Sequence, residues 1–162
     1  MHNVYIGLGS NLKDRFTNIK LALYYLATIG KIVKKSSLYK SSPVENKHQP
    51  YFLNCVVKLV TKLLPYKLLK KLKKIEKKLG RKKSKKRYQP RTIDLDILLY
   101  DKKIIKSKNL TIPHEKLHKR KFVVWPLAEI APNFVHPVLK KKIREIKKEL
   151  RDKSQKIWRI YE

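Results

Sequence analysis

Two aspartates, separated by a single residue, lie in an apolar segment near the middle of the chain. They are Asp94 and Asp96 in RYQPRTIDLDILLY, residues 87–100. On a β-strand, residues i and i+2 point to the same face, so the two carboxylates would lie side by side while Leu95 points the other way. Such a pair can hold a hard cation such as Mg²⁺, which takes oxygen ligands and keeps waters that phosphates can replace. The alternative is a pair of surface acids that form salt bridges with nearby arginines.

The segment just before this pair is strongly basic. RKKSKKRYQPR has cations at positions 81, 82, 83, 85, 86, 87 and 91. Arginine binds phosphate oxygens through a bidentate fork, and lysine binds them as a point charge. Cations beside a magnesium site suit phosphoryl transfer, which depends mainly on positioning and on charge neutralisation. The sequence therefore indicates an enzyme that acts on a phosphate compound.

Two familiar nucleotide-binding motifs do not account for this site. The chain has no GxxxxGK[ST] sequence, so it is not a P-loop enzyme. The GLGSN segment has Gly7 and Gly9 but lacks the third glycine of a dinucleotide fingerprint. We expect these two glycines to permit a tight turn at the end of the first strand.

The net charge of the chain raises the question of nucleic acid. The sequence has 42 Lys and Arg against 12 Asp and Glu, a formal charge of +30. Excess positive charge increases non-specific affinity for polyanions. The lysines occupy polar positions along the whole chain rather than one arm, which favours a solvated surface. We therefore expect no specific nucleic-acid partner, while an RNA- or ribosome-binding module stays open as the alternative from charge alone.

Length and composition fit one domain that covers residues 1–162. The apolar fraction is 42%, enough for a hydrophobic core. The single Cys55 cannot form an internal disulfide, which suits a reducing compartment. The N-terminus does not resemble a secretion signal, and no apolar segment has the length of a membrane span. We expect a cytoplasmic monomer with no membrane partner.

Hydrophobic periodicity predicts alternating strands and helices. The expected strands are 3–8, 31–42, 51–61 and 93–100, and the expected helices are 13–29 and 65–79. We expect Gly30 to end the first helix in the left-handed conformation and Gly80 to end the second. The order βαββαβ predicts an α+β fold with a ferredoxin-like core. A short helix near 115–119 and a Lys-rich helix near 139–150 would be C-terminal additions.

Several segments together resemble one enzyme family. RYQPRTIDLDILLY and LTIPHEKLHKRKFVVWPLAEIAP are similar to segments of the 6-hydroxymethyl-7,8-dihydropterin pyrophosphokinases of folate biosynthesis. YIGLGSNLKDR, SSLYKSSPV, QPYFLN and IEKKLGR occur upstream in the family's order. The resemblance covers essentially the whole chain. It implies transfer of a pyrophosphoryl group from ATP to the hydroxymethyl group of the pterin, release of AMP, use of two Mg²⁺ ions, and a ferredoxin-like core.

The resemblance also implies roles for single residues. The magnesium ligands would be Asp94 and Asp96, and the catalytic group would add Arg81 and Arg91 to them. The positions that would bind ATP are Lys73, Glu76, Arg81, Lys83, Arg87, Arg91, Ile97, His114 and Arg120. The positions that would bind the pterin are Ser41, Ser42, Pro43, Val44, Phe52, Asn54 and Phe122. A flat pterin suits aromatic faces and an amide at its ring edge, although Phe52 and Phe122 could equally be core residues.

One further motif suggests different chemistry. HEKLH, residues 114–118, matches the HExxH sequence in which two histidines on one helical face bind zinc. Pro113 precedes the motif and KRKF follows it, which argues against a long amphipathic helix there. No third ligand is evident. The sequence therefore favours the pyrophosphokinase interpretation over a zinc hydrolase.

Overall fold

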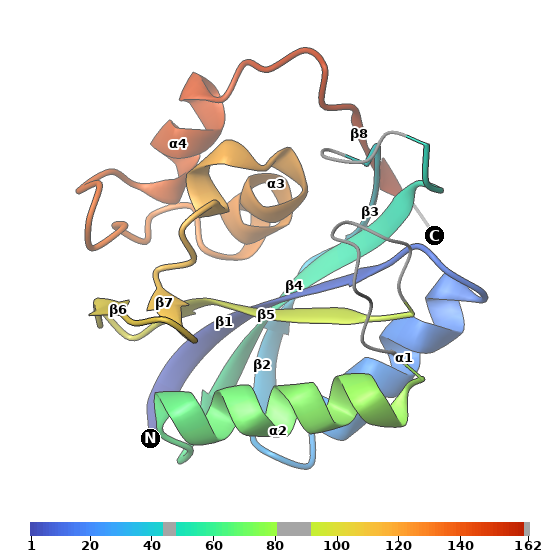
Figure 1. The fold of residues 1–162 in the computed structure, drawn as a ribbon. Helices are drawn as coiled ribbons and strands as arrows, with labels where there is room; N and C mark the ends of the chain where they lie inside the picture. Colours follow the sequence, from blue (N-terminus) through green and yellow to red (C-terminus); the bar gives the residue numbers. More distant parts are fainter. Residues whose placement is uncertain (44–47, 81–91, 161–162) are drawn as a thin grey trace.

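An antiparallel sheet with helices on both faces organises the chain (Figure 1). The computed structural model describes residues 1–43, 48–80 and 92–160. The first elements are β1 (His2–Ser10), α1 (Arg15–Leu26), β2 (Lys31–Lys35), β3 (Leu38–Ser41), β4 (Phe52–Thr61), α2 (Pro65–Lys78) and β5 (Asp94–Tyr100). The C-terminal elements are β6 (Ile105–Lys106), β7 (Thr111–Ile112), the 3-10 helix η1 (Leu117–Lys119), α3 (Lys121–Ile130), α4 (Ile143–Glu149) and β8 (Ile157–Ile160).

The strand order is that of a ferredoxin-like fold. The main sheet runs β5-β1-β4-β3-β8, and β2 pairs with another part of β4. All these pairings are antiparallel. The predicted α+β class with a βαββαβ core and C-terminal additions is therefore confirmed. No helix in the described ranges is long and apolar enough to cross a lipid bilayer.

The second strand of the core is divided in two, so the prediction of one strand over 31–42 was wrong. Ser36 lies at the break: its N–H donates to the Val56 carbonyl at 2.9 Å, and its Oγ accepts from the Val56 N–H at 2.9 Å. A side-chain oxygen thus replaces a backbone partner in the ladder. As a result, β2 pairs with the far half of β4, and β3 pairs with the half that begins at Phe52.

The glycine at the end of the first helix has another role than predicted. Gly30 does not have a positive φ, whereas Gly80, after α2, has φ 88° as expected. Position 30 requires a glycine because a larger residue would not fit: its Cβ would lie 2.6 Å from the Val60 carbonyl oxygen. Helix α1 is also shorter than predicted: Asp14 caps its start by accepting from the Thr17 N–H at 3.1 Å.

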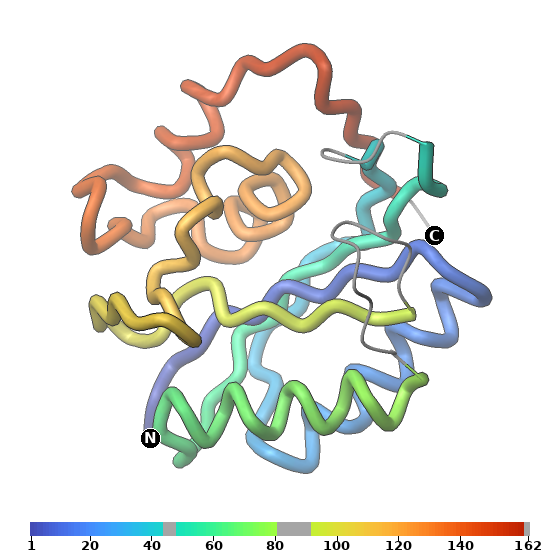
Figure 2. The backbone as a smooth tube through the Cα atoms, in the orientation of Figure 1, coloured from blue at the N-terminus to red at the C-terminus, as the bar shows by residue number. Residues whose placement is uncertain are grey.

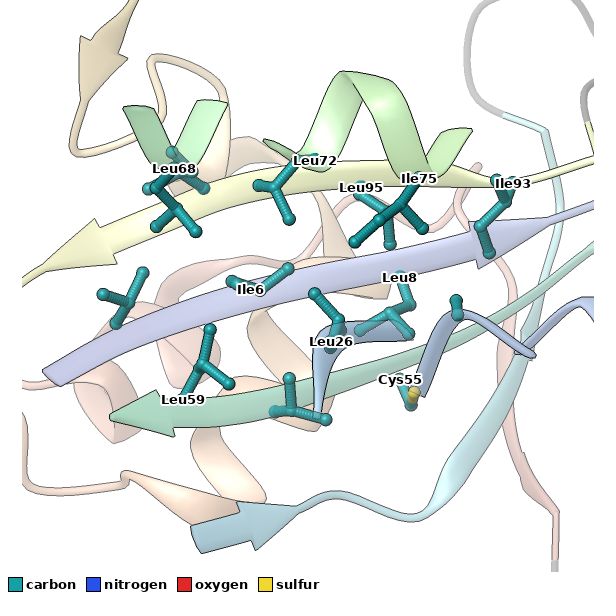
Figure 3. Packing of buried hydrophobic residues seen from close by; sticks show 14 of the residues in the cluster. Ile6, Leu8, Leu26, Cys55, Leu59, Leu68, Leu72, Ile75, Ile93 and Leu95 are labelled. Atoms are coloured by element: carbon teal, nitrogen blue, oxygen red, sulfur yellow. The ribbon is translucent and has the colours of Figure 1, made fainter. Parts of the chain in front are cut away.

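Two hydrophobic clusters cover the two faces of the sheet. On one face, α1 and α2 pack against β1, β4 and β5, with Leu68, Leu72 and Ile75 of α2 in contact with the strands (Figure 3). On the other face lie α3 and α4, which share a second cluster with β4 and β5. Figures 1 and 2 show these two pairs of helices on opposite sides of the sheet.

The C-terminal additions differ from the prediction in detail. The predicted helix near 115–119 is a 3-10 turn of three residues, and the Lys-rich helix near 139–150 is limited to α4. Strand β8 was not predicted. It pairs with β3, so residues 157–160 form an edge of the central sheet. Ile157 of this strand lies opposite Ser41, one of the predicted pterin positions.

Candidate active site

The acid pair lies at the start of an edge strand. Asp94 and Asp96 are the first and third residues of β5, and they pair with Gly9 and Gly7 of β1. Cross-strand partners share a face, so both carboxylates lie on the face where β1 has no side chain beyond a hydrogen. Leu95, between them, is buried in the opposite cluster. The strand thus presents two half-buried carboxylates side by side on an open face.

The two glycines are not in a turn, which corrects the sequence-based interpretation. Both lie inside β1, and neither has a positive φ. A Cβ at Gly9 would approach the Asn54 Oδ1 to 3.2 Å, and one at Gly7 would contact Leu98 at 3.5 Å. Both glycines line the same cavity as Asp94 and Asp96.

Helix α2 fixes the strand that carries the acids. The carboxylate of Glu76, which is 8% exposed, accepts a hydrogen bond from the Leu95 N–H at 2.8 Å. This N–H points away from β1, where an edge strand has no ladder partner. Glu76 therefore binds the edge of β5 between the two aspartates, which limits how far either carboxylate can move.

An aromatic pocket of about 80 Å³ lies on one side of the acid pair. Its lining is Gly7, Leu8, Gly9, Ser42, Gln49, Phe52, Asn54, Cys55, Asp94, Asp96, Leu98, Arg120, Phe122 and Val123. The rings of Phe52 and Phe122 are nearly parallel, with an angle of 10° and 6.5 Å between their centroids. Two carbon contacts of about 3.5 Å each need about 7 Å, so the two rings must separate slightly for a flat ring to stack between them.

Hydrogen bonds fix the side chain of Asn54, a polar residue that lines the aromatic pocket. Asn54, 2% exposed, donates through Nδ2 to the Ser41 Oγ at 2.7 Å and to the Tyr39 carbonyl at 3.3 Å. Its Oδ1 is therefore the amide atom on the side of Gly9. Ser41 and Pro43 are buried and do not line the pocket; Ser41 acts on it through Asn54.

A larger polar pocket of about 390 Å³ lies on the other side of the acid pair. Its lining is Leu69, Lys73, Glu76, Asp94, Leu95, Asp96, Ile97, Lys108, Asn109, Leu110, Thr111, His114, Glu115 and Arg120. The predicted ATP positions within the described ranges thus share one cavity, namely Lys73, Glu76, Ile97, His114 and Arg120. Asp94, Asp96 and Arg120 line both pockets, so they stand between them.

His114 is held as a neutral imidazole. Its backbone N–H donates to the Leu98 carbonyl at 3.0 Å, and its Nδ1 accepts from the Lys116 N–H at 3.2 Å. A ring that accepts at Nδ1 carries its proton on Nε2. Burial lowers the pKa of His114, and the positive charge of Arg120 lowers it further against the opposing effect of Asp94. The imidazole is therefore a hydrogen-bond donor in the polar pocket at neutral pH.

Some predicted residues lie outside the described ranges. They are Val44, Arg81, Lys83, Arg87 and Arg91. Other pocket residues were not predicted. Lys108 and Asn109 lie between the short strands β6 and β7, and Thr111 is the first residue of β7, where no periodicity singles them out. Gln49 lies in a polar loop. In the structure, Asn11 holds this loop: its Nδ2 donates to the Gln49 Oε1 at 2.8 Å and to the Pro50 carbonyl at 3.1 Å.

The residues present fit a magnesium ion better than a zinc ion. Within the described ranges, no group of three or more His, Cys, Asp and Glu side chains could hold a metal. Zinc sites generally need three or four protein ligands, whereas Mg²⁺ is bound by one or two carboxylates with waters and substrate phosphates. Asp94 and Asp96 supply that donor set. His114 and His118 of the HExxH segment lie in a turn rather than on one face of a helix.

Comparisons with known proteins identify the family. The family described as 7,8-dihydro-6-hydroxymethylpterin-pyrophosphokinase matches residues 5–132. A 2-amino-4-hydroxy-6-hydroxymethyldihydropteridine pyrophosphokinase of Aquifex aeolicus is 47% identical over 92% of this chain and 92% of its own length. The enzyme of the same name from Haemophilus influenzae is 42% identical over 85% of this chain and 86% of its own length.

Longer proteins contain a similar unit. A folate synthesis bifunctional protein of Arabidopsis thaliana is 47% identical over 78% of this chain, which corresponds to 26% of that protein. A crystal structure of Plasmodium falciparum HPPK-DHPS has the same fold, with a TM-score of 0.72 at 18% identity over 91% of this chain and 45% of that one.

The fold, the acid pair and these matches place the chain among the ATP-dependent diphosphotransferases. It belongs to the 7,8-dihydro-6-hydroxymethylpterin-pyrophosphokinase family, whose activity serves folate biosynthesis. The predictions of family, enzyme class and function are confirmed. ATP and the hydroxymethyldihydropterin are the substrates that membership of this family implies.

Proposed function

We propose that the two pockets divide the two substrates, with the pterin in the aromatic pocket and ATP in the polar pocket. The observation that carries this proposal is that Asp94, Asp96 and Arg120 line both cavities. A group that passes from ATP to the pterin must cross the boundary between the two binding sites. The residues on that boundary are two acids and a guanidinium, which suit magnesium and phosphate respectively.

The aromatic pocket supplies both features that a pterin requires. The parallel faces of Phe52 and Phe122 stack on the flat ring system. The Oδ1 of Asn54 can accept from an N–H group at the ring edge, because the Nδ2 of the same amide is engaged by Ser41 and Tyr39. Binding in this slot would orient the hydroxymethyl group toward the acid pair.

The polar pocket supplies groups for a triphosphate. Arg120 offers a bidentate fork to phosphate oxygens, Lys73 offers a point charge, and His114 donates from Nε2. The cations of residues 81–91, including Arg81, Lys83, Arg87 and Arg91, would add to this charge. The apolar side chains of Leu69, Leu110 and Ile97 provide surface for the base.

The reaction forms one P–O bond and breaks another. The hydroxymethyl oxygen loses its proton to solvent and attacks the β-phosphorus of ATP, the bond from that phosphorus to the α–β bridging oxygen breaks, and AMP leaves with that oxygen. Two Mg²⁺ ions at Asp94 and Asp96 would neutralise the charge on the phosphates. Arg120 holds the transferring group in line with the pterin oxygen, and His114 donates to a phosphate oxygen. The enzyme thus acts through positioning and electrostatics.

The experiment that tests this proposal follows AMP release from ATP. AMP should form only when ATP, 6-hydroxymethyl-7,8-dihydropterin and Mg²⁺ are all present. Arg120→Ala should lower kcat by roughly a hundredfold, as expected for removal of one preorganised donor. AMP formation without the pterin, or tight RNA binding with no transfer at all, would reject the proposal in favour of an ATPase or a nucleic-acid-binding protein.

A further inference from the structure

The last nine described residues of the chain, 152–160, lie beyond the part that the family match covers. They nevertheless return to the site. This segment makes hydrogen bonds to residues 119 and 121 at the start of α3 and then joins the sheet as β8 (Figure 1). Gln155 in this segment is 9% exposed although it is polar. A buried amide requires partners for both of its ends.

The side chain of Gln155 binds the backbone on both sides of Arg120. Its Oε1 accepts from the Lys121 N–H at 2.9 Å, and its Nε2 donates to the Lys119 carbonyl at 2.8 Å. Asp152 completes the set, because its Oδ2 accepts from the same Nε2 at 3.2 Å. One amide therefore fixes the peptide groups that precede and follow Arg120, from 34 to 36 residues away in the chain.

These bonds add to the local contacts of Arg120, whose carbonyl accepts from the Val123 and Val124 N–H groups at 3.1 and 3.0 Å and whose guanidinium lies 5.4 Å from the centroid of the Phe122 ring. Arg120 is the N-cap of α3 with an extended backbone, and its side chain does not cap the helix. Its own N–H is 3.5 Å from the Leu117 carbonyl, a long contact. The first N–H of α3 belongs to Lys121 and would have no partner within the helix. Gln155 supplies that partner from outside.

The next residue extends the same connection to the other pocket. The Lys156 N–H donates to the Ser42 Oγ at 2.9 Å, and the Ser42 N–H donates to the Lys156 carbonyl at 3.0 Å. Ser42 lines the aromatic pocket, whereas Arg120 lines both pockets. Two consecutive residues of the C-terminal segment thus fix the backbone at both substrate sites.

We propose that Gln155 is a positioning residue for pyrophosphoryl transfer, which acts by holding Arg120 between the two pockets. This proposal rests on the proposed function, because it needs Arg120 to act on the transferring group. Misplacement of a catalytic group by about 1 Å can lower the rate by about a hundredfold. Loss of the Gln155 amide should therefore reduce kcat more than it changes the affinity for either substrate.

The test is a double-mutant cycle of kcat with Gln155→Met and Arg120→Ala. Methionine keeps the length of the side chain and removes both hydrogen-bonding groups. We expect Gln155→Met to lower kcat by roughly tenfold, with KM for ATP and pterin within about threefold. In the Arg120→Ala background the same change should have less than about a twofold effect, because residues that act as a unit are non-additive.

Thr61→Val is the matched control. Its hydroxyl is also buried with two partners, since it donates to the Ile29 carbonyl at 2.7 Å and accepts from the Leu63 N–H at 3.1 Å. Thr61 lies at the end of β4 that pairs with His2, away from both pockets. Its loss should lower the unfolding free energy as Gln155→Met does, with kcat unchanged.

The outcomes distinguish the proposed role of Arg120 in transfer from the proposed positioning role of Gln155. If Arg120→Ala leaves kcat unchanged, the role of Arg120 itself is wrong. If Arg120→Ala lowers kcat while Gln155→Met does not, or if the two losses multiply, the positioning role of Gln155 is overturned. Should Gln155→Met not fold, Gln155→Glu retains the acceptor for the Lys121 N–H and loses the donor to the Lys119 carbonyl. The same cycle with that variant should again be non-additive, and additive losses would overturn the proposal.

Discussion

The two faces of strand β5 are built for different purposes. On one face, Leu95 and Ile97 are buried in the cluster that β5 shares with α2. Figure 3 shows Leu72 and Ile75 beside Leu95. On the other face, Asp94 and Asp96 are half-buried opposite glycines and line two cavities. A single seven-residue strand therefore carries both the packing that stabilises the fold and the carboxylates that we assign to the reaction.

This difference shows how a rigid site can be built at the edge of a sheet. The open face needs carboxylates that do not move, and the buried face provides a strand that cannot shift without disrupting the core. Glu76 adds a direct bond to the strand edge. Substitutions on the two faces should consequently separate stability from turnover.

The largest effect expected is on stability, from Leu72→Ala. Leu72 is completely buried in the cluster between α2 and the sheet. Removal of a buried leucine typically costs about 2–5 kcal/mol, because the transfer free energy is lost and a cavity is left. Urea unfolding should show this loss, while kcat per folded molecule stays within about threefold of the unchanged protein. A large loss of kcat with normal stability would contradict the division between the faces.

Asp96→Asn should have the opposite pattern. Asparagine has nearly the same size, so the fold should be retained, but a negative charge needed for Mg²⁺ is lost. We expect turnover to fall by roughly a hundredfold or more, about 3 kcal/mol of barrier. Steady-state kinetics and urea unfolding on the same preparation measure both quantities. Near-normal turnover would remove Asp96 from the metal site.

Gly9→Ala and Gly7→Ala form a matched pair on the open face. The new methyl group at Gly9 would crowd the Asn54 Oδ1 at 3.2 Å, whereas the one at Gly7 would make an ordinary contact of 3.5 Å with Leu98. We expect Gly9→Ala to raise KM for the pterin about tenfold, or about 1.4 kcal/mol, and Gly7→Ala to change it less than about threefold. Equal effects of the two variants would argue that the pterin is not beside Asn54.

The smallest effect expected concerns the protonation of His114. Its pKa is lowered, first by burial and then by Arg120, so the folded state favours the neutral ring. The stability that it contributes is present above the unfolded pKa of about 6.5 and is lost as pH falls through the lower folded pKa. An NMR titration of its ring protons should give a midpoint below about 6.5. A higher midpoint would mean that the imidazole is not buried beside Arg120.

The sequence predicted the core of the fold because its signals are local. Alternation of apolar residues, Pro65 at the start of α2 and Gly80 after its end are all readable from short windows. The break at Ser36 and the need for Gly30 depend on partners in β4, which no window contains. Strand β8 was missed because its pairing with β3 joins segments more than a hundred residues apart.

Some residues of the candidate site could likewise be predicted from the sequence, and others could not. The spacing of Asp94 and Asp96 indicated that they share a face, and chemistry alone made them candidates for magnesium. Gln155 gave no signal, because a glutamine near the end of a chain becomes informative only when its amide is seen on both sides of Arg120. Positions that act through the backbone of another residue have no pattern in the sequence.

The most direct test of the account is a measurement of metal binding at the acid pair. Mn²⁺ accepts the same oxygen ligands as Mg²⁺ and is visible by electron paramagnetic resonance. Mn²⁺ should be titrated into the protein with a non-hydrolysable ATP analogue and a pterin, for the unchanged protein, Asp96→Asn and Leu72→Ala. We predict that Asp96→Asn weakens Mn²⁺ binding at least about tenfold, while folded Leu72→Ala binds Mn²⁺ as the unchanged protein does. Equal Mn²⁺ affinity in all three proteins would show that the open face of β5 is not the metal site.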